Sequence, residues 1–270
     1  MEAPCYKLAD LNPVARTMLA TVAYRAIESQ RPDAILYDAR ALELAGRFDE
    51  NFLQVAECGD MDRTFTMMRA RQFDRYARQF LERYPQGGVI DIGCGLDTRF
   101  ERIDNGQMRW YGIDLPEVID LRRQLLPEEQ RCILLACSAL EPGWMEQLES
   151  RPVIFLAEGV FPYLTEVDVK KLAVALAEHF PGSELVFDAL TPFSIWLHSR
   201  NQVLRKASVT IHWGIDDSEA LEGWAPGIRL LDEWGYFDEK EPRLGIYSLL
   251  RFIPPMANAN RILHYQLGNP

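Results

Sequence analysis

The residues most able to do chemistry lie in a glycine loop, Asp91-Ile92-Gly93-Cys94-Gly95, which follows the apolar pair Val89-Ile90. A buried strand that leads into such a turn and then into a helix grips a nucleotide-type cofactor at the carboxyl edge of a parallel sheet. A dinucleotide-binding motif would have a third glycine where Thr98 stands, and Asp91 would repel a pyrophosphate but attract a cation. The loop therefore predicts a cationic adenosine cofactor without phosphates, for which S-adenosylmethionine is the obvious candidate. An ordinary glycine-containing turn is the alternative.

Three more polar side chains follow apolar runs and would meet the loop at the same sheet edge. Asp114 ends the second run, where an acid accepts hydrogen bonds from both ribose hydroxyls; it could instead cap the helix that begins at Pro116. Ser138 follows the third run and could bind the adenine amino group, but a turn or capping role fits equally well. Glu158 closes the fourth run and would face the ammonium group of the cofactor, unless it is a solvated strand-end acid.

Two arginines in the long helical pattern before the loop, Arg69 and Arg71, could reach the cofactor from outside the sheet. A guanidinium binds a carboxylate through two parallel hydrogen bonds, so such an arginine could hold the cofactor's carboxylate. Periodicity alone favours a solvated helix face for each of them.

The elements that must position these residues change in character at Pro85-Gln86-Gly87-Gly88, a cluster of helix breakers. Before it the pattern is helical from residue 8, and we expect a helical cap over residues 1–84. After it, short apolar runs alternate with amphipathic segments, which predicts a doubly wound α/β domain over residues 85–270. We expect a mostly parallel seven-stranded sheet that ends in an antiparallel pair, with a lid-like insertion at about residues 191–224. The predicted strands are 89–92, 109–113, 132–136, 153–157, 184–188, 228–233 and 261–267.

Composition restricts the partners of this 270-residue chain. A net charge of −11 disfavours nucleic acid and anionic membranes, because both bind basic surfaces. The sequence shows neither a signal-peptide pattern nor a membrane-spanning run. Its five scattered cysteines predict reduced thiols in a cytoplasmic protein, and its four histidines lack metal-ligand spacing, which predicts no metal site. We therefore expect a small-molecule substrate.

Several motifs together resemble one protein family. They are Arg16-Thr17-Met18-Leu19, Arg69-Ala70-Arg71 with Phe73-Asp74, the loop VIDIGCGLDTR, Gly112 through Val118, AEGVFPYLTE, and Trp213 through Asp217. This combination extends over nearly the whole chain. It is similar to the leucine carboxyl methyltransferase superfamily, and more closely to its bacterial, tetracenomycin-like branch of polyketide-type O-methyltransferases. The resemblance implies the class I methyltransferase fold and an S-adenosylmethionine-dependent O-methyltransferase.

The resemblance also implies roles for individual residues. Gly93 and Gly95 would line the cofactor, while Asp91 would attract its positive charge and Glu158 would face its methionine portion. Arg71 would hold the methionine carboxylate, with Arg16 near it. Asp114 and Leu115 would bind the ribose, and Ser138 and Ala139 would flank the adenine. Tyr163 would point at the methyl acceptor. Many relatives have Asp-Leu where Ser138-Ala139 stand, so the adenine contact is altered in this chain.

The implied chemistry needs little beyond alignment, because the sulfonium already activates the methyl group. A carboxylate acceptor is ionised at neutral pH, whereas a hydroxyl acceptor would need a general base, and no histidine matches such a position. We therefore favour a methyl ester on a carboxylate, with S-adenosylhomocysteine as the second product. The alternatives are a hydroxyl acceptor, a protein C-terminal carboxylate, a non-catalytic cofactor-binding protein, and a dinucleotide-dependent oxidoreductase, against which Thr98 counts.

Overall fold

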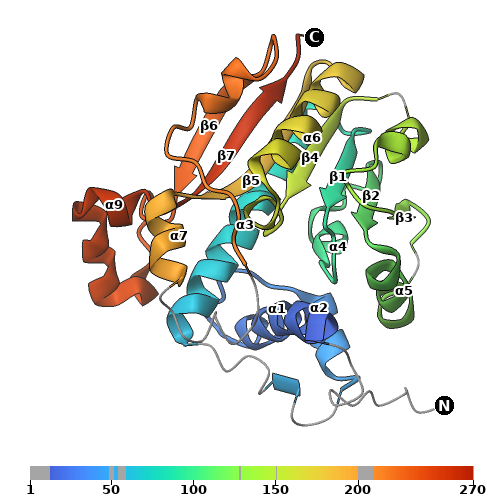
Figure 1. Ribbon diagram of the computed structural model, residues 1–270. Coiled ribbons are helices and arrows are strands. Elements are labelled where there is room, and N and C mark those ends of the chain that lie inside the picture. Colours follow the sequence, from blue (N-terminus) through green and yellow to red (C-terminus); the bar gives the residue numbers. More distant parts are fainter. Residues whose placement is uncertain are drawn as a thin grey trace, which may run out of the picture.

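A computed structural model describes residues 13–48, 52–53, 59–127, 129–149, 151–199 and 210–269, without the side chains of residues 13–17 and 198–199. Its centre is a seven-stranded sheet with the strand order β3-β2-β1-β4-β5-β7-β6 (Figure 1). The strands are β1 Gly88–Ile92, β2 Arg109–Asp114, β3 Cys132–Ala136, β4 Val153–Ala157, β5 Ser183–Leu190, β6 Arg229–Gly235 and β7 Asn260–Leu267. The first five strands pair in parallel, and β7 pairs antiparallel with both β5 and β6.

Helices cover both faces of the sheet (Figure 1). Side chains alternate between the two faces along each strand, so neighbours such as Val89 and Ile90 belong to different apolar clusters. Ile90 packs in the cluster that includes α6 (Glu166–His179). Val89 packs in the cluster that includes α3 (Asp60–Arg83) and α4 (Arg99–Ile103). Because both faces are covered, the strands are continuous apolar runs.

A third apolar cluster joins α1 (Pro13–Ser29) and α2 (Ala39–Ala45) to α3. Leu19 and Val22 of α1 are fully buried in it. These helices lie beyond the end of the sheet where the loops after β1 and β2 emerge (Figure 1). The other described elements are α5 (Pro116–Leu125), α7 (Pro192–Ser199), α9 (Pro254–Ala257) and the 3-10 helices η3 (Pro142–Gln147), η4 (Phe161–Tyr163), η5 (Ala220–Gly223) and η6 (Pro242–Phe252).

The structure confirms the predicted α/β fold and its seven-stranded, mostly parallel sheet. The fifth strand is longer than the predicted 184–188, because its pairing with β7 continues to Leu190. The division into cap, core and lid stays a prediction, and residues 200–209 of the expected lid lie outside the described residues. No described helix is long and apolar enough to cross a membrane.

Candidate active site at the carboxyl edge of the sheet

The glycine loop joins β1 to α4 and is held against β2. The Gly93 N–H donates to the Ile113 carbonyl over 2.8 Å, and the Gly95 N–H donates to Asp114 Oδ2 over the same distance. Gly93 has a φ of 69°, and a Cβ at this position would lie 2.5 Å from Val160 Cγ2. A side chain at residue 93 would therefore strain the backbone and clash with the segment after β4.

Two buried arginines hold the loop by its carbonyl groups. Arg122 of α5 donates from Nη1 to the Gly95 carbonyl over 3.0 Å, and Arg25 of α1 donates from Nη2 to the Leu96 carbonyl over 2.9 Å. The loop is thus fixed both by a helix of the sheet domain and by a helix that precedes it in the chain.

Asp91 is a buried acid in β1, with only 2% of its surface exposed. Its Oδ2 has no hydrogen-bond partner among the described residues, and its Oδ1 lies 3.9 Å from Arg99 Nη1. Burial raises the pKa of Asp91 well above the ordinary value, and Asp97 raises it further. A buried acceptor oxygen without a partner is costly, so this position suits a ligand that brings a donor or a positive charge.

Asp114 ends β2 with each carboxylate oxygen bonded to the backbone. Its Oδ2 accepts from the Gly95 N–H and its Oδ1 from the Leu115 N–H, each over 2.8 Å. Burial raises the pKa of Asp114, and these two hydrogen bonds oppose the shift. Each oxygen still has a lone pair for a ribose hydroxyl. The first residue before α5 is Leu115, so Asp114 is not its N-cap residue.

Ser138 and Ala139 follow β3 in a turn. The Ser138 hydroxyl accepts from the Leu140 N–H over 3.2 Å, and the Ala139 carbonyl accepts from Trp144 Nε1 over 3.2 Å. Ser138 therefore has the turn role that we considered beside adenine binding, and its hydroxyl proton remains available to a ligand.

Glu158, after β4, lies between two arginines. Its Oε1 accepts from Arg69 Nε over 2.9 Å, and its Oε2 forms a close ion pair with Arg99 Nη2. Arg69 also donates from Nη1 to Asp188 Oδ2 over 3.0 Å. The Glu158 side chain is 15% exposed, so it is not the solvated strand-end acid of the alternative interpretation.

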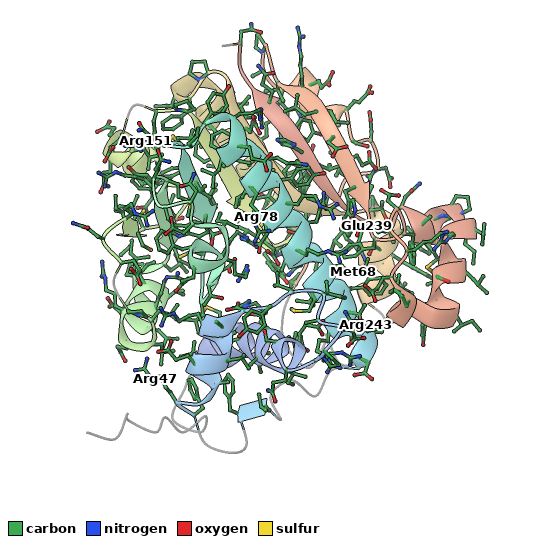
Figure 2. The ribbon with its side chains drawn as sticks, turned by 180° about the vertical axis from the view of Figure 1, so that it is seen from behind. Arg47, Met68, Arg78, Arg151, Glu239 and Arg243 are labelled. Atoms are coloured by element: carbon green, nitrogen blue, oxygen red, sulfur yellow. The ribbon has the colours of Figure 1, made fainter. Side chains whose placement is uncertain are left out.

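Arg71 has different partners from Arg69, although both belong to α3. Successive residues of an α-helix are rotated by about 100° about its axis. The side chains of Arg69 and Arg71 therefore point in different directions. Arg71 Nη2 lies 2.5 Å from Glu239 Oε2, and Arg75 Nη1 lies 2.6 Å from Glu239 Oε1. Glu239 lies beside α3 (Figure 2). The structure thus brings Arg69, and not Arg71, to Glu158.

Tyr163 ends η4, a short helix just after Glu158, and 49% of its surface is exposed. Desolvation of its hydroxyl raises the pKa of Tyr163, while Arg69 lowers it and Asp188 raises it. The phenol therefore stays protonated at neutral pH and can donate a hydrogen bond. Arg16 lies in α1, and its side chain is outside the described set.

Sequence reasoning assigned no role to three further residues that lie here. Asp188 lies near the end of β5 and accepts from the Gly159 N–H over 2.5 Å. It closes the apolar part of that strand, so the rule that pointed to Glu158, an acid after an apolar run, would also have pointed to Asp188. Buried Tyr236 follows β6, and its pKa is raised by burial against the opposing effect of Arg69. Arg99 is fully buried, which no local pattern indicates for an arginine.

These residues fit a cationic adenosine cofactor. Among the described residues Asp91 has an acceptor oxygen without a partner, and Asp114 keeps free lone pairs. Glu158 is a third carboxylate at this edge of the sheet, after β4, which pairs with β1 on the side opposite β2. In the part of the chain that the structure describes, no cluster of His, Cys, Asp and Glu could hold a metal ion.

The sheet order and the site define a class I methyltransferase. Solved structures support the fold: a DUF574 family protein from Streptomyces avermitilis aligns with a TM-score of 0.58 and 16% identity, covering 93% of this chain and 97% of that one. Magnesium protoporphyrin IX methyltransferase from Synechocystis, with bound S-adenosylhomocysteine, aligns with a TM-score of 0.50 and 12% identity, covering 84% and 92%.

Sequence comparison gives the family. The leucine carboxyl methyltransferase family matches residues 18–177. The chain is 32% identical to the tetracenomycin polyketide synthesis O-methyltransferase TcmP of Streptomyces glaucescens, over 94% of this chain and 97% of that one. It is 30% identical to the S-adenosyl-L-methionine-dependent methyltransferase dpfgK of Gibberella zeae, over 89% and 88%. The chain therefore belongs to the leucine carboxyl methyltransferase family and is an S-adenosylmethionine-dependent O-methyltransferase. The expected family, enzyme class and cofactor are confirmed.

Proposed function

We propose that this enzyme methylates a carboxylate oxygen of a small or polyketide-like molecule and releases a methyl ester and S-adenosylhomocysteine. The proposal is supported by the family, whose name describes carboxyl methylation, and by TcmP, whose name places it in polyketide synthesis. When bound, S-adenosylmethionine supplies a methyl group that its sulfonium has already activated. The chain then has to bind both reactants, align them and exclude water.

The observation that carries the proposal is the half-exposed Tyr163 phenol in η4, the short helix just after Glu158. Tyr163 keeps its phenolic proton at neutral pH, and the Arg69 guanidinium lies close enough to affect its pKa. A carboxylate acceptor is already ionised and needs donors that orient it. A hydroxyl acceptor would need a base instead. His212, the described histidine whose backbone N–H binds the Pro162 carbonyl next to Tyr163, is the candidate base for that second reaction.

Cofactor binding is assigned to the residues that face this edge. We assign the ribose to Asp114 and Leu115, the adenine to Ser138 and Ala139, and the methionine ammonium to Glu158 with Asp91 near it. For the methionine carboxylate we favour Arg69, because it contacts Glu158 and Asp188 directly, while Arg71 is held by Glu239. Arg71 and Arg16 are the alternatives.

Matched variants decide between the two arginines. Hydrogen bonds to charged groups contribute about 1.5–3 kcal/mol, so Arg69→Gln should weaken S-adenosylhomocysteine binding about ten- to 150-fold. Arg71→Gln should leave the dissociation constant, measured by calorimetry, close to that of the wild type. If the larger loss occurred in Arg71→Gln, the carboxylate role would belong to Arg71.

The acceptor is tested by the stability of the product. We would incubate the enzyme and methyl-labelled S-adenosylmethionine with aromatic polyketide acids, with the same compounds blocked at the carboxyl group, and with peptides that end in leucine. A methyl ester releases labelled methanol in mild alkali, whereas a methyl ether does not. We expect alkali-labile label only on the free acids, and His212→Ala should retain activity. Alkali-stable label that His212→Ala abolishes would establish hydroxyl methylation, and labelled peptides would establish a protein substrate.

A further inference from the structure

Arg99, the first residue of α4, is fully buried among four carboxylates. Its Nε lies 2.7 Å from Asp74 Oδ1, and its Nη1 lies 2.7 Å from Asp97 Oδ2 and 3.9 Å from Asp91 Oδ1. Its Nη2 pairs with Glu158 Oε2. One guanidinium thus connects acids from α3, the turn before α4, β1 and the segment after β4.

We propose that Arg99 is a positioning residue that orients the Glu158 carboxylate toward the amino group of the bound cofactor. This inference rests on the role proposed above for Glu158. Since the Arg99 side chain has no exposed surface, its influence on a ligand passes through the acids that it holds.

The need for this support follows from the two partners of Glu158. If Arg69 binds the methionine carboxylate, Glu158 loses one of its two guanidinium contacts. Arg99 keeps its place, because Asp74 and Asp97 hold two other edges of its planar group. A fork fixed in this way binds one oxygen of Glu158 and leaves the other free for an ammonium group.

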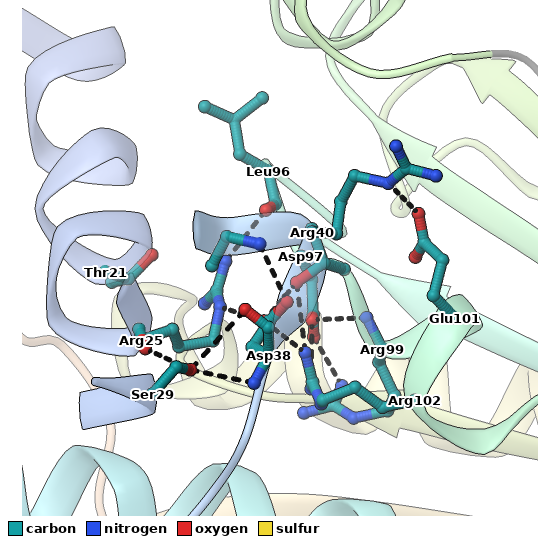
Figure 3. A network of polar contacts seen from close by, with 12 residues as sticks. Thr21, Arg25, Ser29, Asp38, Arg40, Leu96, Asp97, Arg99, Glu101 and Arg102 are labelled. Atoms are coloured by element: carbon teal, nitrogen blue, oxygen red, sulfur yellow. Dashed lines mark hydrogen bonds and ion pairs between the residues drawn. The ribbon is translucent and has the colours of Figure 1, made fainter. Parts of the chain in front are cut away.

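The helices outside the sheet in turn hold Arg99. Asp74 belongs to α3, the helix that also carries Arg69, and its Oδ2 lies 2.8 Å from Arg102 Nε. Arg102 also contacts Asp38, the residue that caps α2, over 2.9 Å and Asp97 over 3.3 Å (Figure 3). The Arg102 side chain is nearly as buried as that of Arg99, with 5% of its surface exposed. The contacts of its guanidinium, however, do not include Glu158.

This difference provides a matched control. We would measure the affinities of S-adenosylhomocysteine and of 5′-methylthioadenosine, which has the same adenosine and sulfur but no amino acid group. In Arg99→Gln the affinity for S-adenosylhomocysteine should fall about tenfold or more, the effect of one lost charged hydrogen bond, while 5′-methylthioadenosine binding is retained. Arg99→Lys should give an intermediate ratio of the two affinities. Arg102→Gln should unfold at a lower temperature than the wild type but keep the wild-type ratio.

Glu158→Gln, measured in parallel, separates the two assignments. If it changes the ratio and Arg99→Gln does not, Glu158 keeps its role and the proposal for Arg99 is wrong. If neither changes the ratio, both assignments fail. An equal loss for both ligands in Arg99→Gln would mean that the loop has collapsed, and would overturn the positioning role. If Arg99→Gln does not fold, Arg99→Lys and Asp74→Asn decide by the same ratio, and wild-type values in both refute the proposal.

Discussion

Asp114→Asn tests the ribose site through the geometry of one carboxylate. In the wild type, each Asp114 oxygen accepts a backbone N–H over 2.8 Å and has one lone pair left for a ribose hydroxyl. An asparagine keeps only one acceptor oxygen, and its amide group would face a backbone N–H. One hydrogen bond to a charged group is thereby lost, which is worth about 1.5–3 kcal/mol, or about ten- to 150-fold in affinity.

The assay compares S-adenosylhomocysteine with its 2′,3′-dideoxy analogue by calorimetry. The wild type should bind the dideoxy analogue more weakly, because the analogue cannot donate to Asp114. In Asp114→Asn the difference between the two affinities should be smaller than in the wild type, because only one acceptor oxygen remains for the ribose hydroxyls. The reasoning would be refuted if the variant weakened both ligands by the same factor, since Asp114 would then only hold Gly95 and Leu115.

Two further predictions concern the loop. Gly93→Ala places a methyl group 2.5 Å from Val160 at a φ of 69°, and should lower the free energy of unfolding by about 1–3 kcal/mol and weaken S-adenosylhomocysteine binding. Gly106→Ala, at a φ of 79° with open space around its Cβ, is the control for backbone strain in urea denaturation and should bind the ligand normally. Burial alone would raise the pKa of Asp97, but Arg99 and Arg102 hold it well below the ordinary value. Asp97 therefore stabilises the fold above its unfolded-state pKa of about 4, and this stability is lost as the pH falls below that value. In acid, the free energy of unfolding of Asp97→Asn should accordingly fall less steeply than that of the wild type; equal slopes would show that Asp97 does not contribute.

The sheet and its edge were predictable because buried parallel strands read as continuous apolar runs, and polar residues after them must meet at one edge. Asp91, Asp114 and Glu158 were placed at this edge in this way, and their roles in cofactor binding stay predictions. The local pattern did not distinguish Arg69 from Arg71, because both lie in a largely polar helix and tertiary partners decide which of them faces the sheet. Asp188 could have been found by the same rule.

The sequence alone could not predict which residues from distant segments would lie at the site. Tyr236 reaches Arg69 only because the sheet places the end of β6 near α3. Asp38, which caps α2, pairs with Arg102 of α4. No repeating pattern in the sequence relates these two segments. Such contacts depend on how the layers pack, and a single sequence shows only which residues are apolar, polar or able to turn.

The position of β7 has a consequence for synthesis of the protein. β7 follows β5 and β6 in the chain but lies between them in the sheet. Until residues 260–267 have left the ribosome, β6 has no neighbour to pair with and β5 has an unpaired edge. An unpaired edge of this kind recruits other strands and promotes aggregation. A nascent chain that stalls after β6 would therefore expose β5, with Val186 and Phe187 at its centre, to chaperones or to another nascent chain.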